Sequence, residues 1–462
     1  MSSVSFLQGL SATQVKALTT TSIQNLSTAQ VNALSTTQAA VLSSTQVAAM
    51  STDDVHAMAS TSLQVMTASA VGGLSLDQIS ALASGASSLT TTQVTGLSAS
   101  VVSQFTQGNL DNFDTAHIQA LTSTQISALN AGNIDTQTVS RLSSTQVGKL
   151  TSSQVNTLST GAVLLALSST QIAGLTSLNA SGLTTDSISL LNNSANMQAL
   201  NAKALAALST DDIAALNSVG GSSLLSTQIA ALTTSQVAAL TTVQISNWVS
   251  TQVQSLSAKQ IVGLDASQLS STQVGQLQGT QIAALGSTQV GEMSSTQFAA
   301  WSSTQLASLS ATGAAGLTTD QVTTLDTNDL AQLNVKSLAA VGTDAIAALS
   351  STQVAGLDAN HLKALTSTQM AAFTTVEATA LTSTQIAQLS SVQIAALSTD
   401  DIATFTSAEI ASISATGMKG LSSADIMALT DAQLDGFGTQ QPNMTNDQVA
   451  AVIAAYNDTT VS

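Results

Sequence analysis

The sequence contains no cysteine, one proline and very few aromatic residues, which make up 2% of the chain. Without cysteine the chain forms no disulfide, and it lacks the thiolate ligands that most structural zinc sites use. With so few aromatic side chains, any core has to be thin and filled by aliphatic groups. Hydrophobic residues nevertheless reach 44%, too many for a disordered polar tract, so we expect the chain to fold around such a core.

Charge is also scarce. Charged residues make up 7% of the chain, and eight Lys and Arg stand against 25 Asp and Glu, for a net charge of −17. Affinity for nucleic acid depends on Lys and Arg neutralising phosphates, so we expect no nucleic-acid partner and no electrostatic docking on anionic membranes. No run approaches the roughly 18 apolar residues needed to span a bilayer, so we expect no membrane insertion. Residues 1–10 lack the charged and apolar regions of a secretory signal peptide.

What the sequence does contain is a repeat of eight residues. Its consensus is a Leu, two Ser or Thr, a Thr, a Gln or Asp, a Val or Ile, and two Ala. The same phase returns over residues 225–264 and 349–405. The opening apolar residue recurs every eight positions at Leu10, Leu18, Leu26, Leu34, Leu42, Met50, Met58, Met66, Leu74 and Leu82.

Each unit carries the signals of a helix N-terminus. Ser43 followed by Gln46 is a capping box, in which the hydroxyl accepts from the backbone of the third helical residue (N3) and the N3 side chain reaches back. Leu42 and Val47 then occupy the two positions that a hydrophobic staple joins. A strand would need apolar residues at every second position, whereas here their spacings alternate between five and three. The unit therefore predicts a helix of about two turns.

Helices this short are unstable alone, so they have to stack. We predict an all-α fold, an α-solenoid of short helices, in which alanines and an occasional glycine such as Gly174 allow close approach. Residues 1–441 form one continuous solenoid with irregular units near 107–142, 177–208 and 217–225; a domain linker at 218–223 is the alternative for the last of these. Residues 442–462 form a capping helix, 446–456 with Thr445 as N-cap, and a tail.

Residues that could support catalysis or bind a metal are few and scattered. His56, His117 and His361 are far apart in sequence, and neither a nucleophile elbow nor a phosphate-binding loop is present. The pairs of adjacent aspartates at 53–54, 211–212 and 400–401 fall at N2 and N3, where a carboxylate favours the helix N-terminus. Residues 108–114 are rich in Asn and Asp, but a turn fits them better than a calcium loop. We expect no catalytic residue, no cofactor and no metal, and therefore no enzyme.

Five aromatic residues occupy Leu or Val positions of the repeat: Phe373, Phe405 and the three possible interface residues Trp248, Phe298 and Trp301. We interpret them first as core substitutions. The alternative is that they are exposed anchors of an interface, and Phe298 with Trp301 is the pair for which this alternative is sharpest.

The units at 42–50, 381–389 and 397–405 read LSSTQVAAM, LTSTQIAQL and LSTDDIATF. This tandem pattern resembles repeat arrays in large bacterial surface or secreted proteins, often labelled haem-utilisation or adhesion proteins. The resemblance covers roughly four-fifths of the chain. It implies an extracellular or cell-surface bacterial protein, exported without a cleaved leader, but no haem-ligating motif accompanies it here.

The leading hypothesis is a structural protein that self-assembles into an extracellular filament, sheath or surface layer. It depends on the sparsely charged periodic surface and on the tendency of head-to-tail contacts to propagate. The alternative is a spacer or adhesin that binds cell-surface glycans or cells through its Ser/Thr face. An ice-binding array of threonines is a third reading, and an enzyme is the least favoured.

Overall fold

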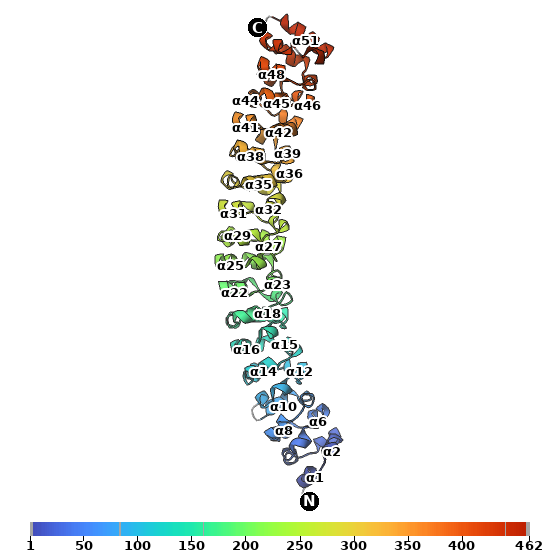
Figure 1. Ribbon diagram of the computed structural model, residues 1–462. Coiled ribbons are helices and arrows are strands. Elements are labelled where there is room, and N and C mark those ends of the chain that lie inside the picture. The colour runs from blue at the N-terminus through green and yellow to red at the C-terminus, as the bar shows by residue number, and fades with distance from the viewer. Residues whose placement is uncertain (1–2, 83–84, 160, 439, 459–462) are drawn as a thin grey trace. The chain divides into compact units, whose positions relative to one another are not determined.

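The computed structural model describes residues 3–82, 85–159, 161–438 and 440–458. Within these ranges all regular secondary structure is helical, with α-helices numbered α1 to α51, seven 3-10 helices and no strand. The predicted α-solenoid of short helices is therefore confirmed. The chain divides into two compact units, Met1–Leu232 and Thr233–Ser462. In each unit successive turns of the chain stack on one another (Figure 1).

The capping box builds each helix. In α6 (Ser44–Ala48), the N-cap Ser43 accepts a hydrogen bond from the Gln46 backbone N–H at 3.2 Å. The Ser43 backbone N–H donates to Oε1 of Gln46 at 2.9 Å. The residue that closes each unit leaves the helix, as Leu142 does with a ψ of 140°. Because this residue is extended, every described α-helix except α51 has four to seven residues, between one and two turns.

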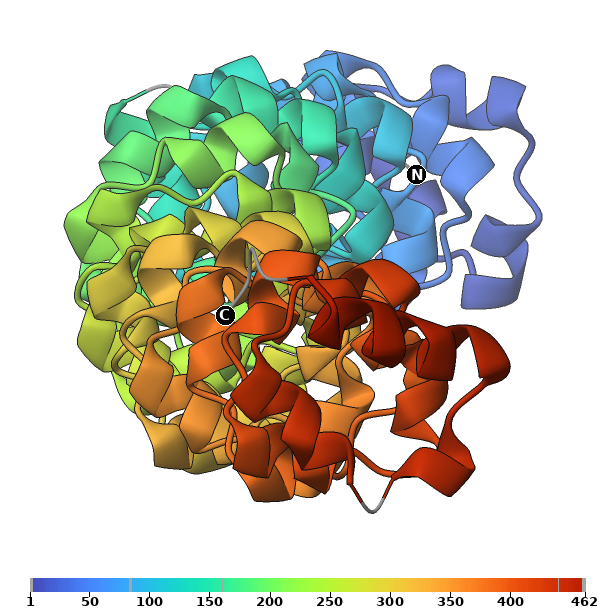
Figure 2. The ribbon, with the colours of Figure 1, turned by 90° about the horizontal axis from the view of Figure 1, so that it is seen from above.

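Contacts between helices set the size of one turn of the solenoid, which we call a coil. Each helix packs against the third helix further along, as α4 (Thr28–Asn32) does against α7 (Thr52–Ala57). Side-chain hydrogen bonds reach the fourth, since Gln46 of α6 contacts the carbonyl oxygen of Val15 in α2 (Ala12–Lys16). A coil therefore contains between three and four eight-residue units. The winding of the helices within each unit can be followed in Figure 2.

The core lies inside the coils and is aliphatic. The Val or Ile at the fourth helical position is almost completely buried, with 0% exposure for Val15, Val47 and Ile229. The closing Leu is also buried, as in Leu34 and Leu42. The opposite side of the helix, illustrated by Thr45 and Ala48 of α6, is exposed. The exposed side of a helix such as α6 therefore presents short hydroxyl and methyl groups.

Some glycines are required by close packing between coils. A Cβ on Gly174 would lie 2.0 Å from the carbonyl oxygen of Ser144, one coil earlier, which is far inside van der Waals contact. The same approach occurs at Gly316, whose Cβ would lie 1.9 Å from the Ser287 carbonyl oxygen. Gly174 thus allows close helix approach, as the sequence predicted.

The irregular sequence segments continue the winding instead of interrupting it. Near 107–142 and 177–208, short 3-10 helices, η2 (Ala131–Asn133) and η3 (Ala180–Gly182), stand where the repeat would place an α-helix. Residues 218–222 form α25 (Ser218–Ser222), which packs against α22 (Ser194–Ala199). This segment is therefore a helix within the first unit, and the division between the two units falls after it, at Leu232.

At the C-terminal side, α51 (Asn446–Tyr456) has Thr445 as its N-cap and covers the residues expected from the sequence. Its inner face, with Gln448, Ala451 and Ala455, is buried. The helix packs against α49 (Ser423–Met427) and α50 (Asp431–Leu434). The part of the expected tail at 459–462 lies outside the described residues.

Candidate functional site: a glutamine ladder between coils

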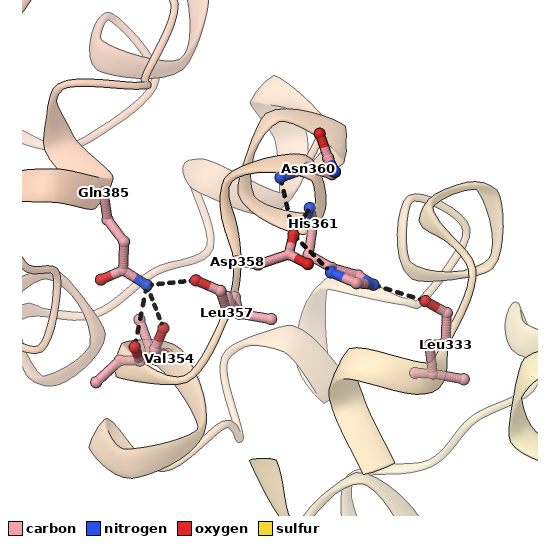
Figure 3. Close-up of polar contacts among 8 residues, drawn as sticks. Leu333, Val354, Leu357, Asp358, Asn360, His361 and Gln385 are labelled. Carbon is pink, nitrogen blue, oxygen red and sulfur yellow. Dashed lines mark hydrogen bonds and ion pairs between the residues drawn. The ribbon is translucent and has the colours of Figure 1, made fainter. Parts of the chain in front are cut away.

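The N3 glutamine of each unit joins two coils. In α45 (Ser383–Ile386), Oε1 of Gln385 accepts from the backbone N–H of its own N-cap residue, Thr382, at 2.9 Å. Its Nε2 donates to the carbonyl oxygens of Val354 at 2.8 Å and Leu357 at 2.9 Å, 31 and 28 residues earlier (Figure 3). One amide group therefore caps its own helix and binds the end of a helix in the preceding coil.

We call this set of contacts the glutamine ladder. Its members are nearly all buried, where an unpaired amide would be costly, and their Nε2 groups donate to carbonyl oxygens between 25 and 32 residues earlier. They include Gln38, Gln46, Gln78, Gln93, Gln125, Gln146, Gln154, Gln171, Gln228, Gln273, Gln281, Gln289, Gln305, Gln321, Gln353, Gln369, Gln385, Gln393 and Gln448.

Two histidines replace glutamine in the ladder. His361 lies at N3 of α42 (Ala359–Ala364), and its Nε2 is 2.7 Å from the carbonyl oxygen of Leu333, 28 residues earlier (Figure 3). His117 makes the same contact with Leu89 at 2.8 Å. A carbonyl oxygen can only accept, so Nε2 carries the hydrogen in both contacts. Both histidines therefore have a structural partner one coil earlier.

Each of these histidines is paired with an N-cap aspartate. Oδ1 of Asp358 accepts from the His361 backbone N–H at 2.9 Å and lies 2.9 Å from its Nδ1. Asp114 is placed in the same way beside His117. The hydrogen bond from the histidine backbone N–H lowers the pKa of both carboxyl groups. The sequence signal for this arrangement is an Asp followed by a His three residues later, in phase with the repeat, which the sequence analysis missed.

Acidic N3 residues cap their helices but donate no hydrogen bond to the preceding coil. Asp54, Asp212 and Asp401 each accept from the backbone N–H of their own N-cap serine, at 3.0 to 3.1 Å. Their positions at N2 and N3 make the aspartate pairs capping features, as expected. An ionised carboxylate has no hydrogen to donate, so it cannot replace the amide that glutamine offers to the preceding coil.

The three aromatic residues singled out in the sequence lie in the core. Trp248, Phe298 and Trp301 are 3%, 1% and 6% exposed. The rings of Phe298 and Trp301 are in contact, with centroids 4.9 Å apart. The alternative in which they anchor an interface does not fit these values, because the repeat turns its Leu and Val positions inward whatever side chain occupies them.

The remaining candidate sites are the possible calcium loop at 108–114, clusters of metal-binding side chains, and the grooves on the surface. Residues 108–114 contribute to α13 (Gln107–Asp111) and the N-cap of α14 (Thr115–Ala120), so a calcium loop does not fit them. Among the described residues no three His, Asp or Glu side chains gather as a metal site would need. In the same part of the chain, every helix is too short or too polar to cross a bilayer. Two open grooves are lined mostly by Ser, Thr, Ala and Gly residues, and each includes a lysine, Lys149 or Lys419.

Comparison with known families gives one match. The family model of the ALTTAQ repeat matches residues 23–52 and 322–359. The first stretch contains the sequence ALSTTQ at 33–38, in which the N-cap serine and the N3 glutamine of α5 (Thr36–Ala39) are three residues apart. No curated protein matches the chain. Over these two stretches the chain is similar to the ALTTAQ repeat, and the similarity covers the unit that forms the glutamine ladder.

Proposed function

We propose that the chain is a non-enzymatic structural protein that self-assembles into an extracellular filament, sheath or surface layer. One observation carries the proposal: the distinctive polar side chains of the repeat are used in holding coil to coil. In Gln385, for example, both ends of the amide group are occupied within the chain. The amide groups of the glutamine ladder are therefore occupied in hydrogen bonds between coils and are not available to bind a substrate.

The surface supports the same function. Its periodic rows of Ser, Thr and Ala carry few charges, so two copies can approach without removing many charged groups from water. A net charge of −17 gives some mutual repulsion, which salt screens. Assembly should therefore strengthen as the ionic strength rises. The extracellular or cell-surface location rests on the resemblance of the repeat to bacterial surface-protein arrays.

A second function, a spacer or adhesin that binds cell-surface glycans, is favoured by the grooves between coils. The groove at Lys419 is also lined by Ser367, Thr368 and Ser391, whose short hydroxyl side chains can pair with sugar hydroxyls. This groove is open and shallow, so we place glycan binding second to self-assembly.

Sedimentation velocity and negative-stain electron microscopy over a concentration series test the two functions. We expect assemblies of uniform width that grow with concentration and with salt. A chain that stays monomeric at high concentration across salt and pH contradicts self-assembly. If such monomers also bind immobilised polysaccharide, and substitution of Lys419 weakens the binding, the chain acts as an adhesin.

A further inference from the structure

One phenylalanine is excluded from the core. The chain has seven, and Phe6 is 65% exposed. It lies in α1 (Ser3–Gln8), next to Leu7, whose side chain is buried at 4% exposure. The remaining six are between 0% and 5% exposed: Phe105, Phe113, Phe298, Phe373, Phe405 and Phe437. Phe6 is therefore an apolar ring that the stacking of coils does not use.

An apolar groove lies at the other end of the chain, in the second unit. Its volume is about 420 Å³, and it lies beside α51 and the short helix η6 (Asp435–Phe437). Val449, Ile453 and Tyr456 follow one face of α51 and are 38%, 59% and 45% exposed. The groove is completed by Leu434, Phe437 and Met444 among others. Three apolar side chains of α51 are therefore exposed along one side of the groove.

The walls of the groove are held in place. The opposite face of α51 is buried against α49 and α50, which fixes the helix. Across the groove, the hydroxyl of Tyr456 donates to Oδ1 of Asp435 at 2.8 Å. This hydrogen bond positions the tyrosine ring and leaves a carboxylate beside the apolar lining. A volume of about 420 Å³ is larger than a phenylalanine ring.

The two regions carry opposite charge. Residues 1–52 contain one charged side chain, Lys16, which is exposed in α2. From residue 421 to 462 there is no Lys or Arg, and there are five carboxylates: Asp425, Asp431, Asp435, Asp447 and Asp458. Because the positive region is at one end of the sequence and the negative region is at the other, the partner that fits both is a second copy of the chain.

A glutamine outside the ladder points to the same partner. Gln14 of α2 forms a capping box with Ser11, and its Oε1 accepts the Ser11 backbone N–H at 2.8 Å. Its Nε2 donates to no carbonyl among the described residues, whereas ladder glutamines donate to the preceding coil. Gln14 is exposed, so its amide hydrogens are accessible to a carbonyl oxygen of another copy.

We propose that copies dock head to tail, with Phe6 of one copy inserted in the groove beside α51 of the next. Lys16 then approaches the carboxylates around Asp435. This inference rests on the proposed self-assembly and names its surfaces. The two surfaces differ, so the contact is heterologous, and each docked copy presents a new groove or a new Phe6. Such a contact propagates into a filament.

Two variants block the two halves of the contact. Phe6→Ala removes the inserted ring, and Ile453→Glu places a charge in the groove; both positions are exposed, so neither change should disturb folding. Each variant alone should raise the concentration needed for assembly about tenfold or more, as for the loss of a central interface anchor. Val392→Ala, which shortens another exposed apolar side chain, is the matched control and should assemble as the unmodified chain does.

Mixing the two variants tests the polarity of the contact. The Phe6→Ala copy keeps its groove and the Ile453→Glu copy keeps its Phe6, so an equimolar mixture can form one junction and no more. Sedimentation velocity should then show a dimer containing one copy of each variant. If the mixture forms no dimer, or if Phe6→Ala assembles like the unmodified chain, head-to-tail docking is overturned while self-assembly stands. If the unmodified chain never assembles, both proposals fail.

Discussion

Individual glutamine residues have the shape and chemistry that the fold needs at N3. The carboxamide offers an acceptor to its own N-cap and a donor to the preceding coil, and its two side-chain methylenes span the distance. Asn179 shows that a shorter amide can also reach, with Nδ2 2.8 Å from the Val147 carbonyl oxygen. The carboxylate of Asp401 keeps only the capping half of this role. Capping and coil-to-coil bonding are therefore two separate roles of the N3 side chain. An amide performs both, whereas the carboxylate of Asp401 performs only the first.

Gln385→Glu tests that separation. Glutamate keeps an acceptor for the Thr382 N–H, but it faces the Val354 and Leu357 carbonyl oxygens with no hydrogen to donate. We expect a loss of about 1–3 kcal/mol in the free energy of unfolding near pH 7, measured by urea denaturation. Gln388→Glu in the same unit makes the same charge change outside the ladder and should cost much less. Equal losses would mean that the coil-to-coil bonds contribute little.

The N-cap aspartates make the stability of the fold depend on pH in the acid range. The pKa of Asp358 is held below its ordinary value of 3.8, chiefly by the hydrogen bond from the His361 backbone N–H. Folding therefore favours the ionised carboxylate. Its contribution is complete above about pH 3.8 and is lost as the pH falls through the lower value in the folded chain.

Thermal melts of Asp358→Asn between about pH 2 and pH 7 check this dependence. Near neutral pH the unmodified chain should have a higher melting temperature than the variant. The difference in melting temperature should become smaller below about pH 3.8. Asp344→Asn, which removes an exposed carboxylate that is not an N-cap, controls for net charge. A gap that stays constant through the acid range would rule out a contribution from ionised Asp358.

At the scale of helices, packing between coils supplies what the short elements lack. A four-residue helix such as α20 (Ser169–Ile172) cannot persist alone in water. Here Ile172 is 0% exposed, and the following Gly174 lies against the Ser144 carbonyl of the preceding coil. The helix is thus stable because of its neighbours, and the closeness of their backbones limits which side chains fit.

Gly174→Ala should therefore destabilise the chain. Its Cβ would lie 2.0 Å from a backbone oxygen that is not free to move away, so we expect a loss of about 1–3 kcal/mol in thermal or urea unfolding. Gly342→Ala is the control, because nothing lies within 4 Å of its Cβ position. Gly342 is the N-cap of α40 (Thr343–Ile346), where alanine is less favourable than glycine, so this change should cost no more than about 1 kcal/mol. If the two variants were equally stable, the backbones at Gly174 and Ser144 would not be in close contact in solution.

At the scale of the whole molecule, the repeat makes the units interchangeable. Each unit contacts neighbours one coil away, so stability is a sum of local terms and not the property of one central core. Removing one complete unit preserves the phase of every apolar and capping position. After deletion of residues 382–389, Gln393 takes the place of Gln385 and meets the same Val354 and Leu357 carbonyls.

We expect the chain lacking residues 382–389 to fold, with unchanged helical signal per residue by circular dichroism and a melting temperature within a few degrees. Deletion of residues 382–385 removes fewer residues but takes away the capping box of α45, and it shifts the phase by half a unit. That chain should be clearly less stable. The reverse order of stability would contradict a fold built from interchangeable units.

The sequence by itself determined the local parts of this protein. The capping box of α6, the bounds of α51 and the inward Val and Leu positions involve residues no more than a few places apart, so they can be predicted from one unit. The close approach at Gly174 also follows from the lack of a side chain. Phe298 and Trp301 could be assigned to the core because they occupy inward Val and Leu positions of the repeat. The sequence alone left open whether their side chains are exposed.

Only the tertiary structure decided how many units make a coil and which groups meet across it. The bond from Gln385 to Leu357 joins residues 28 apart, and that interval depends on how alanine and glycine backbones pack in space. The second role of glutamine, the place of His117 and His361 in the ladder, and the exposure of Phe6 all follow from this winding. They could not be read from one unit, because an eight-residue repeat is compatible with more than one number of units per turn.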